Sequence, residues 1–318
     1  MSTEKLPSPG NRGRFAPSTT GRVHPGTLLA GLLCWLDARA RGGEVLLRLE
    51  DLDQGRTKPG FVDAINRDLA WFGLDWDGVS RQSEHIERYE TKVEELAGEG
   101  RVYACDCSRA RIRDSGTRAP DGSLRYPGTC RDNLVDRLDW RGLDLPLRIR
   151  LDEEFVDLRD ESGLDLSGDP ALLFGDPLLR RRDGAYAYHF VSVVDDEADG
   201  VDRIVRGRDL APSTTLQAAL RAIFGFPLPR YRHHALLLES TGEKLSKLHG
   251  AVDIRALALR YDARDLVGRL AHFVGLVPEG TRCLPMDLVA EFDWSRVGAS
   301  DVILDWSEES GLRRLRRD

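Results

Sequence analysis

The sequence predicts an α/β protein in which a doubly wound, mostly parallel sheet is split by an insertion. Segments typical of helices and strands alternate near both ends of the chain, whereas the middle is irregular. The 318 residues are 41% hydrophobic, which is enough to bury a sizeable core in roughly two domains. These observations exclude a chain that is disordered throughout.

The first half of the chain alternates clearly between the two periodicities. Residues 28–40 are apolar and helix-forming and stop before Gly42, and residues 44–50 place Val45, Leu47 and Leu49 on one face of a strand. Two further helices are predicted over residues 61–72 and 86–97.

The second half is less regular. Short strands are predicted at residues 145–151 and 155–158, and a hairpin over residues 178–194 turns at Asp183-Gly184, with a second strand that ends at Val194. The alternation resumes with a strand at 203–206, a helix at 213–224 and a strand at 235–239. We therefore predict a flexible tail (1–12), a first half of the doubly wound domain (13–100), an insertion (101–184), a second half of that domain (185–250) and a short helical region (251–318).

Charge and hydropathy exclude two classes of protein. The net charge of −7 argues against a protein that coats nucleic acid by charge alone. The longest uncharged apolar stretch, residues 23–36, has 14 residues, fewer than the ~20 that a spanning helix needs. The first 14 residues lack the apolar core of a signal peptide, so we expect a cytosolic protein with no membrane partner.

The first candidate site is the segment 13–27, which leads directly into the first predicted helix. His24, Gly26 and Thr27 stand where backbone N–H groups at a helix N-terminus would bind phosphate. Gly26 lets a ring or phosphate approach the backbone, and His24 adds a hydrogen bond. The alternative is a polar loop with one exposed histidine.

The second candidate site is Lys244-Leu245-Ser246-Lys247, in a loop after the strand at 235–239. Two lysines three residues apart can face one polyanion and neutralise the charge that spreads over a reacting phosphate. The alternative is a solvated surface loop.

The third candidate site holds a metal. Cys105, Cys107, Cys130 and Tyr126 supply three thiolates and one phenolate, a set of four that suits tetrahedral Zn²⁺. Five cysteines, an odd number, fit a reducing compartment, and Cys34 and Cys283 are expected to be buried hydrophobes. Alternatively, the three clustered cysteines stay reduced in a loop.

Together, the His24-Pro25-Gly26-Thr27 and Lys244–Leu248 segments resemble the two signatures of class I aminoacyl-tRNA synthetases, His-x-Gly-His and Lys-Met-Ser-Lys-Ser. The strings RFAPS (14–18) and RLEDLD (48–53) resemble the glutamyl/glutaminyl branch. Departures from the family pattern are Thr19 in place of Pro, Thr27 in place of the second His, and Leu245 and Leu248 in place of Met and Ser. The resemblance extends from about residue 13 to residue 250.

The resemblance implies a Rossmann-like catalytic domain and a set of site residues. By it, the glutamate site is lined by Arg14, Phe15, Ala16, Pro17, Ser18, Glu50, Tyr188 and Arg206; ATP is bound by His24, Gly26, Thr27 and Lys247; and His24, Lys244 and Lys247 are catalytic. The chemistry agrees, since a carboxylate suits an ammonium group and arginine suits a carboxylate. Without the family, Glu50 could belong to an acidic surface or a Mg²⁺ site, Tyr188 to the core of a strand, and Arg206 to an ion pair with Asp209.

The order Cys-x-Cys…Tyr-x₃-Cys, with Ser108–Ile112 after the first pair, resembles the glutamyl-queuosine tRNA(Asp) synthetases. That resemblance implies activation of L-glutamate by ATP with Mg²⁺, and transfer to the queuosine wobble nucleoside of tRNA(Asp), by a monomer with one structural Zn²⁺. Only 71 residues follow Lys247, which predicts that no anticodon-binding domain is present. The alternatives are charging of a tRNA 3′ end and a non-catalytic zinc-containing RNA-binding module. Basic clusters at 109–113, 180–182 and 313–317 are candidate contacts to tRNA phosphates.

Overall fold

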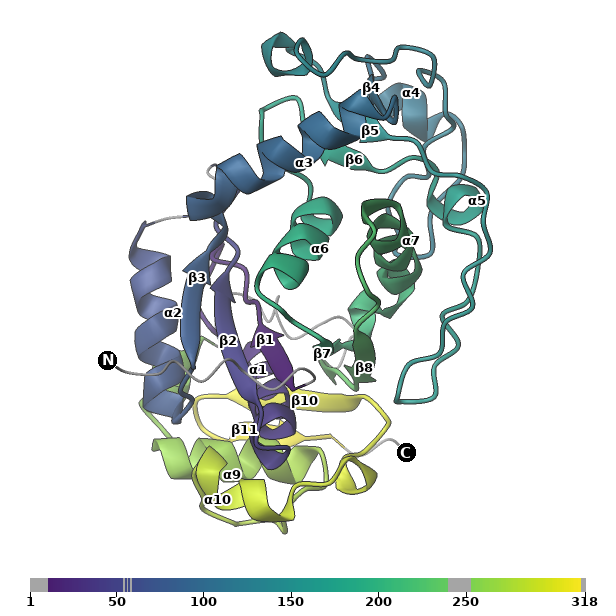
Figure 1. The fold of residues 1–318 in the computed structure, drawn as a ribbon. Helices are drawn as coiled ribbons and strands as arrows, with labels where there is room; N and C mark the ends of the chain where they lie inside the picture. Colours follow the sequence, from purple (N-terminus) through teal and green to yellow (C-terminus); the bar gives the residue numbers. More distant parts are fainter. Residues whose placement is uncertain (1–10, 54, 56, 58, 240–252, 316–318) are drawn as a thin grey trace, which may run out of the picture. The chain divides into compact units, whose positions relative to one another are not determined.

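The protein is described by a computed structural model over residues 11–53, 55, 57, 59–239 and 253–315, which group into two compact units (Figure 1). The first unit takes the described parts of residues 1–80, 201–208 and 229–318, and the second takes residues 81–200 and 209–228. The predicted domain limits at residues 100 and 184 do not coincide with these limits, because α3 (Ile86–Gly98) and α6 (Tyr188–Ala198) pack on each other within the second unit. The domain assignment itself stays a prediction.

The first unit contains the parallel strands. Its elements are β1 (Arg12–Phe15), α1 (Pro25–Ala40), β2 (Glu44–Leu49), α2 (Pro59–Phe72), β3 (Gly78–Arg81), β7 (Arg203–Gly207), β8 (Arg230–His234), β9 (Leu237–Leu238), α8 (Ile254–Ala258), α9 (Ala263–Phe273), α10 (Pro285–Leu288), β10 (Val302–Ser307) and β11 (Gly311–Arg314). The strands β1 and β2 pair in parallel, as do β7 and β8. The backbone N–H of Asp202 donates to the carbonyl of Arg12 (3.2 Å), which places β7 beside β1.

The second predicted segment, residues 44–50, is confirmed as a strand over Glu44–Leu49. Val45, Leu47 and Leu49 are all fully buried, as the alternation predicts. Arg48, on the opposite face, is buried as well. Both faces of β2 are therefore covered, as is usual for a strand in a parallel sheet.

The helix α1 begins at Pro25, three residues earlier than predicted, because His24 acts as its N-cap and Pro25 occupies the first turn. Most of its 16 residues are buried, since the helix packs on β1, β2 and β7 and also on α9 and α10. A helix that is apolar on nearly every side needs cover on nearly every side. Within the described ranges, no helix combines the length and the apolar character that a membrane crossing requires.

The prediction that residues 251–318 are helical is wrong in part. The helices α8, α9 and α10 are present, but the described chain ends in two strands. The strand β10 pairs in parallel with β9, matching Val302 with Leu237, and antiparallel with β11. These strands depend on partners far away in the sequence, which local periodicity does not reveal.

The second unit contains an antiparallel sheet with helices. Its elements are α3 (Ile86–Gly98), β4 (Val102–Ala104), α4 (Arg109–Arg113), β5 (Leu147–Ile149), α5 (Pro170–Phe174), β6 (Leu178–Arg180), α6 (Tyr188–Ala198) and α7 (Thr214–Phe224). The sheet order is β4-β5-β6, with both pairs antiparallel. The predicted strand at 155–158 is reduced to an isolated bridge between Val156 and Gly168, and β8 was not predicted.

The prediction of a strand that ends at Val194 is wrong. The turn at Asp183-Gly184 is present, with the N–H of Arg181 donating to the carbonyl of Ala185 (2.8 Å), but the chain then enters α6 at Tyr188. A short apolar run does not distinguish a buried strand from a buried helix. The buried carboxylate of Asp195 helps to favour the helix here. This carboxylate accepts hydrogen bonds from Tyr89 (2.8 Å) and Gln82 (2.9 Å) of the neighbouring helical segment.

A buried carboxylate joins three parts of the first unit. Asp37, on α1, is 3% exposed and accepts hydrogen bonds from Nε and Nη2 of Arg203 on β7 (2.6 and 3.0 Å). It also accepts one from Nε1 of Trp294 (2.6 Å) and one from Nη2 of Arg41 (2.9 Å). Burial alone would raise the pKa of Asp37, but the hydrogen bonds from Arg203 and Trp294 outweigh it, so the pKa lies below its ordinary value.

Replacing Asp37 with Asn should lower the free energy of unfolding by about 3–5 kcal/mol, because the Arg203 guanidinium stays buried without its counter-charge. A depressed carboxylate pKa contributes stability that is present above the unfolded-state pKa, about 3.9, and is lost as the pH falls through the folded-state value. Urea unfolding between pH 7 and pH 3 measures both effects. The control Asp305→Asn removes a surface pair with Arg313 (3.6 Å) and should cost less than about 1 kcal/mol. Equal losses in the two variants would contradict the prediction.

Candidate active site and metal centre

The carboxyl ends of the parallel strands in the first unit place several predicted substrate-site residues near one edge. Arg14 and Phe15 end β1, and Glu50 follows β2 directly. The carbonyl of Glu50 accepts from Thr19 through both the backbone N–H (3.3 Å) and the Oγ1 hydroxyl (2.9 Å), and the N–H of Glu50 donates to the carbonyl of Pro17 (3.3 Å). The segment 16–19 is therefore held beside Glu50, so the structure brings these predicted residues together.

Two buried side chains, Arg14 and Arg206, belong to the same unit. Arg14 is 4% exposed, and its carbonyl accepts a hydrogen bond from the thiol of Cys34 (3.2 Å). Arg206, on β7, is also buried; its Nε donates to Nε2 of His233 (3.1 Å), the residue opposite it on β8. Two guanidinium groups near the ends of strands can bind carboxylates.

Sequence reasoning missed His233, which helps to position Arg206. The histidine is buried, and its ring stacks on Tyr231 at 6.3 Å between ring centroids. Because Nε2 of His233 accepts a hydrogen bond from Arg206, the proton of the neutral ring lies on Nδ1. The paired histidines at 233 and 234 were visible in the sequence, but their alignment with Arg206 depends on the register of β8.

The N-terminus of α1 has the predicted form of an anion site. His24 is the N-cap, and its Nδ1 accepts from the N–H of Thr27 (3.4 Å), which leaves the proton of the neutral ring on Nε2. A Cβ at Gly26 would lie 3.0 Å from Cε1 and 3.2 Å from Nδ1 of His24. A side chain at position 26 would therefore crowd the His24 ring, which is a reason for glycine that does not depend on a ligand.

Two further predicted groups do not belong to the described part of the first unit. Tyr188 is the first residue of α6 in the second unit, so the alternative in which it lies in the core of a strand is wrong. Its ring meets that of His189 edge-on, with 5.1 Å between centroids. Lys244 and Lys247 lie outside the described residues, and their roles stay predictions.

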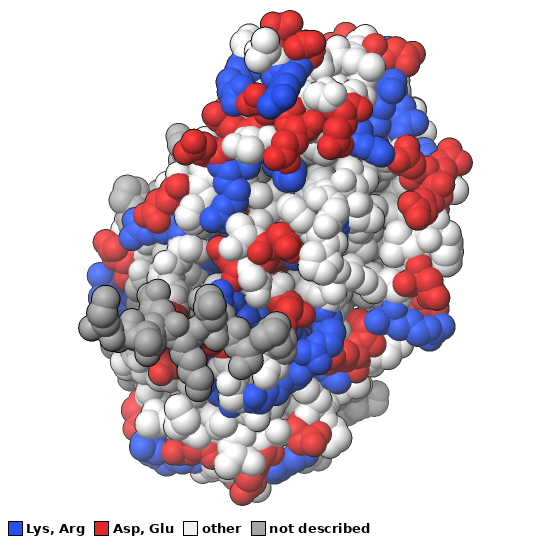
Figure 2. All heavy atoms as spheres, in the orientation of Figure 1, with Lys and Arg blue, Asp and Glu red and all other residues white. Residues whose placement is uncertain are grey.

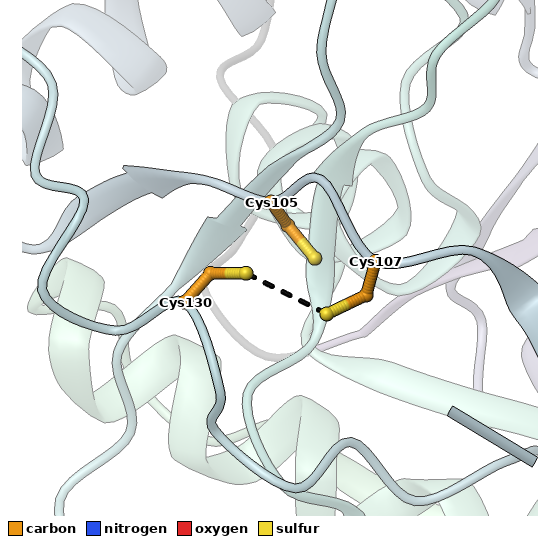
Figure 3. A group of neighbouring side chains, drawn as sticks. All are labelled: Cys105, Cys107 and Cys130. Atoms are coloured by element: carbon orange, nitrogen blue, oxygen red, sulfur yellow. Dashed lines mark hydrogen bonds between the residues drawn. The ribbon is translucent and has the colours of Figure 1, made fainter. Parts of the chain in front are cut away.

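The three cysteines of the second unit converge, as Figure 3 shows. Cys105, Cys107 and Cys130 are buried, and their Sγ atoms all lie within 4.8 Å of one another, with 3.5 Å between Cys107 and Cys130. Ligands about 2.3 Å from a tetrahedral zinc ion stand about 3.8 Å apart. The thiol cluster therefore fits the spacing of a zinc site.

Tyr126 completes the set of four. Its hydroxyl lies 3.4 Å from Sγ of Cys105 and 3.9 Å from Sγ of Cys107, and it accepts a hydrogen bond from the N–H of Cys130 (2.9 Å). The guanidinium of Arg148 lies 3.7 Å from the centre of the Tyr126 ring. The phenol oxygen thus lies within 4 Å of two of the three thiols, and its role as the fourth ligand stays a prediction.

The surroundings affect the acidity of these ligands differently. Burial opposes ionisation of Cys105, but the hydrogen bonds that it shares with Tyr126 and Arg148 outweigh burial and lower its pKa. Burial raises the pKa of Cys130 to about 11, and burial together with the hydrogen bond to Cys105 raises the pKa of Tyr126 well above its ordinary value. A cation bound here would have to displace protons from some of these groups.

Several arginines of the basic clusters that were predicted to contact tRNA form hydrogen bonds or ion pairs within the protein. Nη2 of Arg180 donates to the carbonyl of Leu143 (2.6 Å), and Arg181 pairs with Asp183. Arg111 lies 3.8 Å from Asp106. Figure 2 shows acidic and basic side chains interspersed over the face drawn.

Comparison with known proteins agrees with this geometry. Residues 12–284 match the family model of the tRNA synthetases class I (E and Q), catalytic domain. The chain belongs to this family. It is therefore an enzyme of the ligase type, with the mixed α/β catalytic domain and parallel sheet of class I synthetases.

Relatives within the family are similar over nearly the full chain. A Nocardia farcinica protein named glutamyl-Q tRNA(Asp) synthetase is 41% identical over 96% of both chains. A Chromobacterium violaceum protein of the same name is 42% identical over 93% of this chain and 98% of its own. The solved glutamate tRNA ligase of Elizabethkingia meningosepticum, in complex with its amino acid, shares the fold: the TM-score is 0.75 at 24% identity, over 92% of this chain and 66% of that one.

The thiol cluster predicts that the purified protein carries about one zinc ion per chain. Replacing Cys130 with Ser should remove most of the zinc. The variant keeps only two of the three thiolates, and the remaining ligands bind the ion far less tightly. Elemental analysis by mass spectrometry measures the content. Cys283→Ser, a buried cysteine outside the cluster, is the matched control. Full zinc content in the Cys130 variant would show that the cluster is not the site.

Proposed function

We propose that the protein activates L-glutamate with ATP and transfers the glutamyl group to the queuosine nucleoside of tRNA(Asp). One observation carries the proposal: the relatives with that name are 41–42% identical over more than nine-tenths of this chain. The arrangement of Arg14, Glu50, Arg206 and the α1 N-terminus in the first unit supports the same chemistry. A cytosolic location and a monomeric state stay predictions.

In this proposal, charged side chains of the first unit select glutamate. The carboxylate of Glu50 binds the α-ammonium group, and Arg14 and Arg206 bind carboxylates of the substrate. The hydrogen bonds from Thr19 and to Pro17 fix the backbone of Glu50 and so orient its side chain. Ser18 and Tyr188 contribute further polar contacts, as the family resemblance implies.

The α1 N-terminus binds ATP. The positive end of the helix dipole at Gly26 and Thr27 faces the phosphates, and His24, whose Nδ1 accepts from the N–H of Thr27, donates from Nε2. Mg²⁺ bound with ATP would offset the charge of the phosphates. Lys244 and Lys247 stabilise the charge that builds up on the phosphates in the transition state.

The reaction then follows in two steps. A glutamate carboxylate oxygen attacks the α-phosphorus, the bond to the bridging oxygen of pyrophosphate breaks, and glutamyl-adenylate forms. A hydroxyl of the queuosine cyclopentenediol attacks the glutamyl carbonyl, AMP leaves, and an ester forms as the hydroxyl loses its proton. The protein contributes position and charge and forms no covalent intermediate. Zn²⁺ at Cys105, Cys107, Tyr126 and Cys130 would hold the insertion together structurally.

Transfer of labelled glutamate into total tRNA tests the proposal. With ATP and Mg²⁺ present, label should enter tRNA from queuosine-containing cells and not tRNA from queuosine-free cells. Equal label in both pools would instead indicate charging of the 3′ end. Label in neither pool, without glutamate-dependent release of pyrophosphate from ATP, would indicate an RNA-binding module that has no turnover.

Replacing Glu50 with Gln should raise the KM for glutamate about 10- to 100-fold, because it removes the charged partner of the substrate ammonium group. The KM for ATP should stay within about twofold. Glutamate-dependent exchange of pyrophosphate into ATP measures both constants. Glu153→Gln, at an exposed position in the second unit, is the control. An unchanged KM for glutamate in the Glu50 variant would place the ammonium group elsewhere.

A further inference from the structure

A hairpin in the second unit connects the thiol cluster to the start of α6. Residues 117–125 fold back on themselves, with the N–H of Arg125 donating to Thr117 (3.2 Å) and that of Ala119 to Ser123 (2.9 Å). At the base of the hairpin, Leu124 packs against the core formed by the cysteines and Tyr126. The tip is a tight turn with Gly122 at φ +82°, a conformation that favours glycine.

The carboxylate of Asp121, at this tip, faces two helix N-termini. Its Oδ2 lies 3.3 Å from Oγ of Ser213, the N-cap of α7, and 3.8 Å from Nε2 of His189, the second residue of α6. Oδ1 accepts from the backbone N–H of Ser123 (2.9 Å), which orients the carboxylate. The side chain is only 14% exposed.

The first turns of α6 and α7 contain no anionic group; the short 3-10 helix that leads into α7, Arg208–Ser213, carries Asp209. Both α6 and α7 lack an acidic residue in the first turn and a side-chain hydrogen bond at the N-cap. The positive end of a helix dipole favours a nearby anion, and Asp121 supplies one from another segment. The pKa of Asp121 is held well below its ordinary value, first by the nearby His189 ring and then by the hydrogen bonds from Ser123, so the group is ionised at neutral pH.

We propose that Asp121 is a positioning residue that holds the first turn of α6 and thereby sets the place of Tyr188 in glutamate binding. The Tyr188 ring packs edge-on against His189, which Asp121 faces. This inference rests on the proposed function, because it assigns a purpose to Tyr188. It adds a residue that none of the sequence motifs contains.

Two variants distinguish the loss of the negative charge at Asp121 from the loss of a negative charge elsewhere in the same segment. Asp121→Asn keeps the shape and removes the charge. Asp114→Asn makes the same change at an exposed position in the same stretch between Cys107 and Tyr126. We expect Asp121→Asn to raise the KM for glutamate about fivefold to tenfold, with kcat and the KM for ATP within about twofold, and Asp114→Asn to behave as wild type.

A second measurement reports on the environment of residue 188 without depending on enzyme activity. With 3-fluorotyrosine placed at position 188, the ¹⁹F resonance should shift in Asp121→Asn and stay unchanged in Asp114→Asn. A wild-type resonance or a wild-type KM for glutamate in Asp121→Asn would overturn the inference, as would a loss of thermal stability with neither change. Wild-type protein that fails to activate glutamate would instead overturn the proposed function, and the fluorine measurement would still report on Asp121.

Discussion

The packing of the first unit depends on satisfying one buried negative charge. Asp37 is carried by α1, and its partners come from β7 and from Trp294 near the C-terminal strands, so three distant parts of the chain meet at one carboxylate. A buried charge without partners is costly, whereas the two oxygens of Asp37 accept four hydrogen bonds. The same contacts fix β7 against α1, and β7 carries Arg206. The network that stabilises this unit therefore also places a residue of the candidate site.

Parallel pairing explains why the candidate substrate residues of this unit lie near one another. Arg14 and Glu50 are 36 positions apart, yet β1 and β2 run in the same direction, so the segments after both strands emerge at one edge. The bridge between Ser18 and Glu50 continues the pairing beyond the strands. The helix α1 then begins within this connection, which gives one unit both buried arginines and a helix N-terminus.

In the second unit a single hairpin contacts both the thiol cluster, through Leu124, and the helices α6 and α7, through Asp121. The Tyr126 hydroxyl accepts a hydrogen bond from Cys130 of the thiol cluster, and Tyr126 directly follows the hairpin whose tip carries Asp121. Asp176 extends the same core, accepting from Tyr103 (2.7 Å) and from Arg131 (2.6 Å). The hairpin 117–125 thus links the packing around the cysteines to the first turn of α6, where Asp121 faces His189.

The sequence by itself determined the helices and strands with strong periodicity, such as α1, β2 and α3, the three cysteines at 105, 107 and 130 that the structure brings together, and the family. These features depend on residues close together in the chain or on distinctive spacing. Only the tertiary structure decided that Tyr188 begins a helix, that β10 and β11 close the described chain, and that His233 faces Arg206. Each of these depends on a partner far away in the sequence: the neighbours of Asp195, the pairing with β9 and the register of β8. Local patterns carry no information about such partners, because a buried apolar run satisfies a helix and a strand equally well.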